Sequence, residues 1–348
     1  MTELDRTAIL RWLSCDDQVA LDELWRQANL VRKQHVGDDV HLRGLIEISN
    51  HCLRQCHYCG LRVGNRSLSR YRMSPDEILV AAKKARDLGY GTVVLQAGED
   101  DELTVDLVCD VVRRIKREFA LAVTLSLGER SLDELAAWRQ AGADRYLLRF
   151  ETSNQELFAR IHPPRGQSRA PRLDILRALA ALGYEVGSGV MLGIPGQTYE
   201  DVASDLELFR ALNLDMIGVG PFIAHPETPL GRAAPEPGPG QVPASELMTY
   251  KVIALARLLC PDTNIPSTTA LATLNLAEGR ELALQRGANV VMPNLTPPEY
   301  RVHYEIYPAK ACIRETADIC NRCLTGRITK LGRPIGKGPG ASPKRLSR

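Results

Sequence analysis

Three cysteines lie close together in residues 52–59, which read Cys-Leu-Arg-Gln-Cys-His-Tyr-Cys. Cys52, Cys56 and Cys59 have the spacing CxxxCxxC on a short stretch that follows an apolar segment. Thiolates this close together suit a soft metal ion or an iron–sulfur cluster. Structural zinc sites nearly always have four protein ligands. Three thiols therefore favour a 4Fe-4S cluster with one iron open to another ligand. A zinc site completed by His57 or a distant cysteine, and three buried thiols, are the alternatives.

A second group of cysteines lies near the end of the chain. Cys312, Cys320 and Cys323 have the spacing Cx7CxxC, which suggests a second metal site closed by a water or another side chain. Only Cys320 and Cys323 have close ligand spacing, so a structural role for these thiols stays open.

The composition fits a folded protein with a large core. Of 348 residues, 44% are hydrophobic and 25% are charged. The net charge of +2 gives no general attraction to nucleic acid or to a membrane, and no apolar run is long enough to span one. The start, MTELDRTAIL, lacks a signal-peptide pattern. Nine cysteines without an export signal indicate a reducing, cytoplasmic location.

The elements that would position these residues alternate along the chain. Residues 1–35 have a helical pattern, and residues 41–49 form a β-branched strand that leads into the cysteine stretch. Capping-box patterns at 74–77 (Ser-Pro-Asp-Glu) and 131–134 (Ser-Leu-Asp-Glu) mark two helix starts. Helices, several of which end at glycine, then alternate with seven more predicted strands, at 92–95, 121–125, 145–150, 185–191, 215–219, 264–267 and 289–292. Eight such units predict a (βα)8 TIM-type barrel, with an open, doubly wound parallel sheet as the alternative.

We predict three regions within this architecture. They are an N-terminal helical extension over 1–40, the barrel over 41–300 and a C-terminal, cysteine-containing extension over 301–348. From Leu324 onward the chain has seven Lys or Arg residues and no acidic residue. This composition predicts a solvated basic tail, with contact to an acidic partner as the alternative.

Unusual polar residues follow several predicted strands, where barrel enzymes place their functional groups. Arg145 and Arg149 are four apart on one strand, so their side chains share a face. If that face is the barrel lumen, the two guanidiniums need anions such as a substrate carboxylate; pairing with nearby acids is the alternative. Glu151, at the same strand end, is expected either to bind an ammonium or hydroxyl group or to be structural.

The CxxxCxxC spacing after a first barrel strand resembles the radical S-adenosylmethionine (SAM) enzymes. Tyr58 matches the aromatic position next to the last cysteine of that family. The resemblance implies that Cys52, Cys56 and Cys59 bind a 4Fe-4S cluster whose open iron chelates SAM. It also implies that reduction of the cluster cleaves SAM to a 5′-deoxyadenosyl radical.

Within that family, the chain resembles the HydE group of FeFe-hydrogenase maturases over nearly its whole length. The resemblance lies in residues 71–75, 94–100, 123–129, 142–149, 193–198, 218–229, 264–270 and 287–294. The late Cx7CxxC resembles the site of an auxiliary 2Fe-2S or 4Fe-4S cluster in some members. Phe150 departs from the group's pattern, which has histidine there; little effect is expected because its side chain should face away from Arg149.

The resemblance assigns roles position by position. The catalytic set is the three cysteines of the CxxxCxxC stretch together with Arg149. SAM contacts are expected from Tyr58, Gln96, Glu151, Arg172 and Met191. The internal substrate cavity is expected to be lined by Thr124, Arg145, Arg149, Met216, Thr268, Thr269, Tyr304 and Tyr307.

The implied activity is the conversion of an iron-bound cysteine, CO and cyanide precursor during assembly of the two-iron subcluster. The implied partners are a small anionic organometallic or amino-acid-derived substrate, other hydrogenase maturases, and a reductant such as flavodoxin or ferredoxin. Alternatives are an amino-acid mutase resembling methylornithine synthase, a biotin-synthase-like enzyme, or a metal-binding maturation scaffold without SAM turnover. No nucleic-acid or membrane partner is expected.

Overall fold

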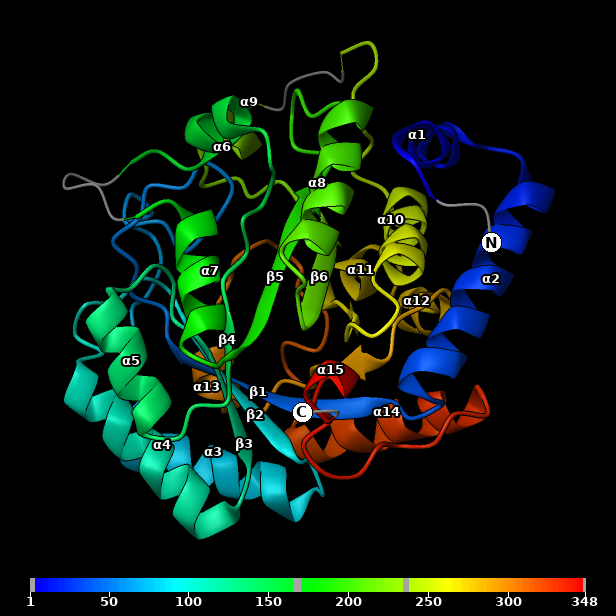
Figure 1. Cartoon of the computed structure of the whole chain (residues 1–348). Helices are drawn as coiled ribbons and strands as arrows, with labels where there is room; N and C mark the ends of the chain where they lie inside the picture. The colour runs from blue at the N-terminus through cyan, green and yellow to red at the C-terminus, as the bar shows by residue number, and fades with distance from the viewer. Residues whose placement is uncertain (1–3, 165–169, 234–237, 347–348) are drawn as a thin grey trace.

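The computed structural model describes residues 4–164, 170–233 and 238–346. Eight parallel strands surround a central space, and helices cover their outer side (Figure 1). The strands are β1 His41–Ser49, β2 Thr92–Ala97, β3 Ala122–Ser126, β4 Arg145–Leu147, β5 Glu185–Leu192, β6 Met216–Pro221, β7 Pro266–Ser267 and β8 Val290–Val291.

The sheet closes almost completely into a barrel. Its strand order is β6-β5-β4-β3-β2-β1-β8-β7, and all neighbours are parallel. Asn264, just before β7, forms a parallel bridge with Met216 at the start of β6. The main-chain N–H of Ile217 donates to the Asn264 carbonyl oxygen at 2.9 Å, which joins the two edge strands. The predicted (βα)8 barrel is confirmed, and the open sheet is excluded.

Most barrel helices begin where the sequence provides a cap. Ser74 with Glu77, and Ser131 with Glu134, form the two capping boxes expected from the sequence. The helices after β1 through β6 are α3 Pro75–Asp87, α4 Val105–Phe119, α5 Leu132–Gln140, α6 Gln155–Ile161, α7 Arg172–Ala181, α8 Tyr199–Ala211, α9 Pro229–Ala233 and α10 Glu246–Leu259. The later helices are α11 Thr269–Leu274, α12 Gly279–Gln285, α13 Pro298–Arg301, α14 Ala317–Lys330 and α15 Pro343–Leu346.

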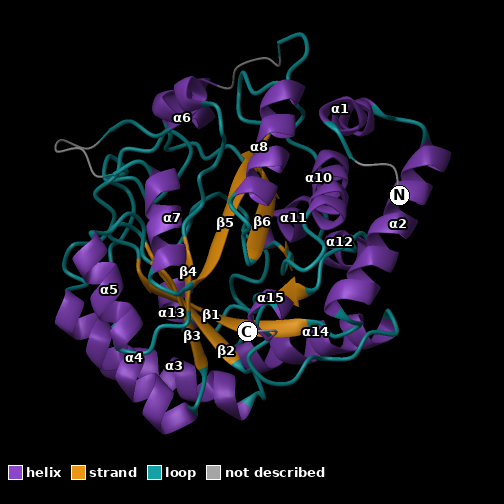
Figure 2. Ribbon diagram, in the orientation of Figure 1, coloured by secondary structure: helices purple, strands orange, loops and turns teal. Residues whose placement is uncertain are grey.

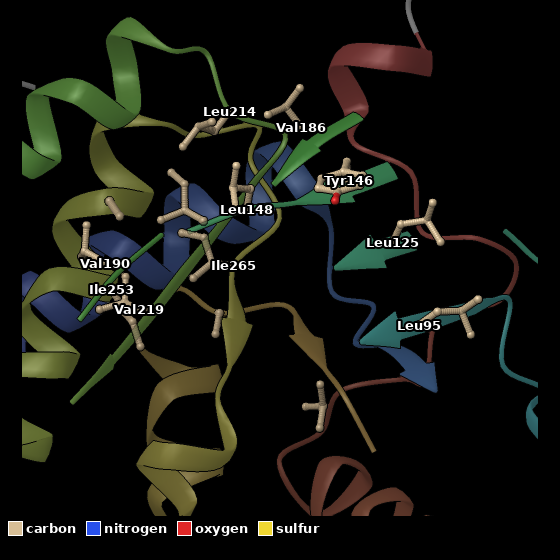
Figure 3. Packing of buried hydrophobic residues seen from close by; sticks show 14 of the residues in the cluster. Leu95, Leu125, Tyr146, Leu148, Val186, Val190, Leu214, Val219, Ile253 and Ile265 are labelled. Carbon is tan, nitrogen blue, oxygen red and sulfur yellow. The ribbon is translucent and has the colours of Figure 1, made fainter. Parts of the chain in front are cut away.

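Helices cover the outside of the strands (Figure 2). Strand residues alternate between an apolar outer face buried against these helices (Figure 3) and an inner face that lines the lumen. Leu95, Leu125 and Tyr146 are fully buried in the layer between strands and helices. Their neighbours in the chain face the lumen instead, as Gln96 and Ser126 do. Burial of the outer layer therefore fixes which side chains the barrel presents inward.

The N-terminal extension consists of α1 Arg6–Ser14 and α2 Gln18–Val36, which lie against the outside of the barrel (Figure 1). Asp17 caps α2, as its sequence position predicts. Arg6 makes ion pairs with Glu200 and Glu207 of α8. No described helix has both the length and the apolar character needed to cross a membrane.

The C-terminal segment closes the amino-terminal end of the barrel. The carbonyl oxygen of Pro339 accepts hydrogen bonds from Thr92 at 2.8 Å and Arg145 at 3.1 Å. The carbonyl oxygen of Gly340 accepts from Arg43 at 2.9 Å. Side chains of three strands thus bind the main chain of this segment.

The end of the segment is held by its own charges. Arg345 forms an ion pair of 2.8 Å with Asp215, whose side chain is only 4% exposed. Lys344 donates to the carbonyl oxygen of Leu214 and to the hydroxyl of Thr263. The expectation of a solvated tail is therefore wrong for the part of the tail that the structure describes. Charge composition does not reveal that the barrel end offers a carboxylate and carbonyl oxygens to these cations.

Candidate active site

A cavity of about 360 Å³ opens at the carboxyl-terminal ends of the strands and continues into the lumen. All three cysteines of the CxxxCxxC stretch line it, together with residues that follow β2, β3, β4, β6 and β7. Such a position is where barrel enzymes assemble their sites from strand ends.

The main chain fixes the cysteine stretch against neighbouring segments. The N–H of Leu53 donates to the Glu99 carbonyl oxygen, and the N–H of His57 donates to that of Ile161, at 3.0 and 2.8 Å. Gly98 allows close approach, because a Cβ there would lie 2.6 Å from the Cβ of Cys52. The loop is therefore held before any ligand binds.

The chemistry of the three thiols suits a cationic metal centre. Burial, together with the nearby Cys52, raises the pKa of Cys59 to about 12. Burial also raises the pKa of Cys56, as do the two neighbouring thiols. Clustered, buried thiolates need positive charge beside them, which an iron–sulfur cluster bound through deprotonated cysteines would supply. The residues present fit such a group.

A charged cluster surrounds the inner side of this loop. The carboxylate of Glu129 accepts from Arg172 Nε at 2.8 Å and lies 3.5 Å from Arg54 Nη1. Glu99 lies 3.7 Å from Arg54 Nε, and His162 Nε2 lies 3.4 Å from Glu129. These five residues connect the cysteine loop with the ends of β2 and β3, the end of α6 and the start of α7.

The two carboxyl groups among these five residues differ in how readily they ionise. Burial opposes ionisation of Glu129, but the hydrogen bond from Arg172 and the positive charges of Arg172 and Arg54 outweigh it and lower the pKa of Glu129 to about 2. Burial and the neighbouring Glu129 raise the pKa of Glu99. Burial lowers the pKa of His162 to about 4, and the positive charges of Arg172 and Arg54 act in the same direction. Glu129 is thus the permanent anion that the guanidiniums share.

Arg149 and Glu151 form a second charged pair at the end of β4. Arg149 Nη2 lies 3.2 Å from Glu151 Oε2 and donates to the carbonyl oxygen of Val190. Glu151 has a φ of +65°, a left-handed conformation that costs energy for a non-glycine residue. Main-chain hydrogen bonds to Gly189 and Met191 hold it there. The strained backbone directs the Glu151 carboxylate into the cavity.

Most residues predicted from the resemblance do meet in this cavity. Gln96 Nε2 lies 3.3 Å from the Tyr304 hydroxyl oxygen across it. The other predicted residues in its wall are Tyr58, Arg149, Glu151, Arg172, Met191, Met216, Thr268, Thr269 and Tyr307. Their ligand contacts stay predictions.

Thr124 and Arg145 do not line this cavity. They line a much smaller space nearer the amino-terminal end, below Leu147 and Met216, which border both spaces. Arg145 already pairs with Glu185 at 2.8 Å. Four strand residues span about 13 Å, so two side chains on one face lie at different depths. The expectation that Arg145 and Arg149 share one anion pocket is wrong for this structure.

The late cysteines lie beside the barrel, on and before α14. Cys312 has a left-handed backbone with a φ of +61°. A hydrogen bond from the Cys320 thiol lowers the pKa of Cys312 to about 6. Cys320 is buried, whereas Cys323 is exposed. Two of the three thiols are thus in contact, and the auxiliary cluster stays a prediction.

Sequence reasoning missed several charged residues of the site. Lys310 reaches the cavity from the C-terminal extension and pairs with Glu47 of β1. Arg54 and His162 also line the cavity. Glu99 and Glu129 each follow a glycine at a strand end. This local pattern indicates the end of the barrel on which they lie, but it does not indicate which residues they contact. Nothing in the spacing of Lys310 or His162 marks them.

Comparison with known proteins agrees with this geometry. The family model described as the Radical SAM superfamily matches residues 46–209. The chain is 44% identical to the [FeFe] hydrogenase maturase subunit HydE of Thermotoga maritima, over 96% of this chain and 93% of that protein. It is 30% identical to 3-methylornithine synthase of Methanosarcina acetivorans, over 80% and 76%.

Solved structures agree with the same fold. A crystal structure of methylornithine synthase (PylB) matches with a TM-score of 0.81 and 26% identity, over 96% of this chain and 94% of the other. The maturase HydG matches with a TM-score of 0.79 over 98% and 75%, and its 17% identity supports the fold alone.

The chain therefore belongs to the radical SAM superfamily and is an enzyme of that class. Within the superfamily it is HydE-like. Membership implies a 4Fe-4S cluster and SAM, and the three thiols on the cavity wall match that requirement.

Gly128 offers a matched test of how tightly Glu99 is held. Gly128 and Gly89 both have a φ of +78°, but a Cβ at Gly128 would lie 2.1 Å from Glu99 Cγ, whereas Gly89 has open space. We expect Gly89→Ala to lower the free energy of unfolding by about 1 kcal/mol, and Gly128→Ala to lower it clearly more. Denaturant unfolding of both variants measures this. Equal losses would show that Glu99 moves freely.

Proposed function

We propose that this protein reductively cleaves SAM and uses the resulting 5′-deoxyadenosyl radical in maturation of an FeFe-hydrogenase. The substrate we propose is an iron-bound cysteine carrying CO and cyanide, a precursor of the two-iron subcluster. The 44% identity to Thermotoga maritima HydE, over 93% of that protein, carries this proposal. The charged cavity behind the cysteine loop supports it.

We assign the cluster to Cys52, Cys56 and Cys59. When bound, the cluster supplies the electron that divides SAM into methionine and the radical. Around it, Tyr58, Gln96, Glu151, Arg172 and Met191 would orient SAM. Glu151 suits the amino group of SAM, because its buried Oε2 lies near Arg149 but makes no hydrogen bond with the described residues. The fixed Arg172 would contribute a positive charge at the same wall.

The substrate end of the cavity combines cations with hydroxyl groups. The guanidinium of Arg149 lies in the cavity wall, and its Nε has no hydrogen-bond partner among the described residues. Thr268, Thr269, Tyr304 and Tyr307 surround the same space. An anionic iron complex would find charge-assisted hydrogen bonds there. Arg145 and Thr124, at greater depth, would act only on a ligand that passes Met216.

The reaction needs one electron per SAM, so we propose a flavodoxin or ferredoxin as donor. Other hydrogenase maturases would supply the substrate and accept the product, and the proposed location is the cytoplasm. An auxiliary 2Fe-2S or 4Fe-4S cluster at Cys312, Cys320 and Cys323 is not required by this scheme.

A radical SAM amino-acid mutase is the second candidate. Two observations favour it, the 30% identity to 3-methylornithine synthase and the TM-score of 0.81 to PylB. Such an enzyme would rearrange a free amino acid with no iron bound to it. Turnover with a free amino acid but none with the iron–cysteine complex would select this candidate.

Cleavage of SAM tests the proposed chemistry. Anaerobically reconstituted and reduced wild-type protein should convert SAM to 5′-deoxyadenosine, and Cys56→Ala should lose at least a hundredfold of this rate. Cys109→Ala is the matched control, because Cys109 is equally buried but lies in α4, outside the cavity. Liquid chromatography measures the product. Undiminished turnover by Cys56→Ala would remove the cysteine assignment.

Substrate affinity tests the role of Arg149. A charge-assisted hydrogen bond contributes about 1.5–3 kcal/mol, so Arg149→Gln should raise KM for the iron–cysteine complex about tenfold or more. Arg149→Lys keeps the charge, so its KM should lie between the values of the wild-type protein and Arg149→Gln. Steady-state SAM cleavage against substrate concentration measures both. An unchanged KM in Arg149→Gln, with SAM affinity also unchanged, would contradict the anion-binding role.

A further inference from the structure

His162 makes a direct contact with one of the three proposed cluster ligands. Its Nδ1 lies 3.0 Å from the sulfur of Cys56. The residue follows the last residue of α6 and is only 3% exposed, so water does not compete for this contact. No assigned role in the proposed reaction uses it.

The other ring nitrogen determines which one carries the proton. His162 Nε2 lies 2.9 Å from Arg172 Nη2. A guanidinium only donates hydrogen bonds, so Nε2 must accept and Nδ1 must carry the hydrogen. The carboxylate of Glu129 lies farther from Nε2, at 3.4 Å, and already accepts from Arg172 at 2.8 Å. The N–H of His162 therefore points at the Cys56 sulfur.

The ring is also held in position from other sides. It stacks on Phe158 with ring centroids 4.9 Å apart, and its main-chain N–H donates to the Phe158 carbonyl oxygen. The carbonyl oxygen of the preceding Ile161 accepts from the main-chain N–H of His57, next to Cys56. The donor and the cysteine thus belong to two directly connected segments. Rotation of the ring would break its contacts with Phe158 and Arg172.

A cysteine bound to iron has lost its proton and can only accept a hydrogen bond. We propose that His162 is a positioning residue that donates Nδ1–H to the Cys56 thiolate and favours the reduced state of the cluster. Reduction adds negative charge to the cluster sulfurs, so a donor stabilises the reduced form more than the oxidised one. This inference rests on the proposed assignment of Cys56 as a ligand, but not on the substrate.

Two substitutions that replace the imidazole of His162 with an amide distinguish the contact to sulfur from the contact to Arg172. The amide nitrogen of His162→Asn reaches about the place of Nδ1 and can still donate to sulfur. The amide of His162→Gln lies near the place of Nε2, so its oxygen keeps the Arg172 contact while the sulfur loses its donor. Phe158→Leu removes the stacking alone and controls for looser packing.

The midpoint potential of the cluster, titrated by electron paramagnetic resonance, is the readout. Loss of one such hydrogen bond should lower the equilibrium constant for reduction about tenfold in His162→Gln, which is 59 mV for one electron. His162→Asn and Phe158→Leu should stay close to wild type. A wild-type potential in iron-loaded His162→Gln, or equal shifts in all three variants, would overturn the proposal.

If the variants bind no iron, a measurement on the wild-type protein tests the same contact. Protein grown with 15N-histidine should show a 15N coupling to the reduced cluster in pulsed electron paramagnetic resonance, and absence of that coupling would overturn the contact. Wild-type protein that binds no 4Fe-4S cluster would instead contradict the proposed function, so the two failures are distinguishable.

Discussion

The buried carboxylate of Glu129 is the interaction on which the rest of the site depends. A single anion after β3 compensates the guanidinium of Arg54 in the cysteine loop and that of Arg172 at the start of α7. Removing a charged partner from such a buried group is costly, because the remaining charges lose their compensation. The cysteine loop, the proposed SAM wall and His162 are therefore positioned by one shared charge as well as by packing.

The interior of the barrel contains two polar regions at different depths, one near each end of the strands. Near the carboxyl-terminal ends, charged groups surround an open cavity. Arg149 and Glu151 pair there, but Arg149 Nε and Glu151 Oε2 make no hydrogen bond with the described residues. Near the amino-terminal end, Arg145 is neutralised by Glu185 and by the main chain of the C-terminal segment. The structure thus distinguishes a guanidinium available to a ligand from one that serves the fold. This division supports placing substrate binding at the upper end alone.

The sequence predicted the parts of the fold that repeat and the parts that carry local signals. The strand rhythm predicted the barrel, the capping boxes at Ser74 and Ser131 predicted helix starts, and Cys52 to Cys59 predicted the position of the site. Strands β7 and β8 are only two residues long, shorter than their apolar patterns suggested. Their pairing depends on barrel closure, a tertiary effect that no local pattern contains.

Other features depend on contacts between distant segments. The His162–Cys56 contact spans 106 positions and the Arg345–Asp215 pair spans 130. Periodicity gave Arg145 and Arg149 the same face but carried no information about depth. Composition indicated a solvated tail because it does not include the carbonyl oxygens and Asp215 that bind the tail.

The central claim is that three cysteines leave one iron open and that SAM binds to it. Electron–nuclear double resonance of the reduced, reconstituted protein with SAM tests this claim most directly, with 15N in the amino group and 17O in the carboxylate. The account predicts hyperfine coupling from both labels. Protein that contains four irons and binds SAM, yet shows coupling from neither label, would contradict it.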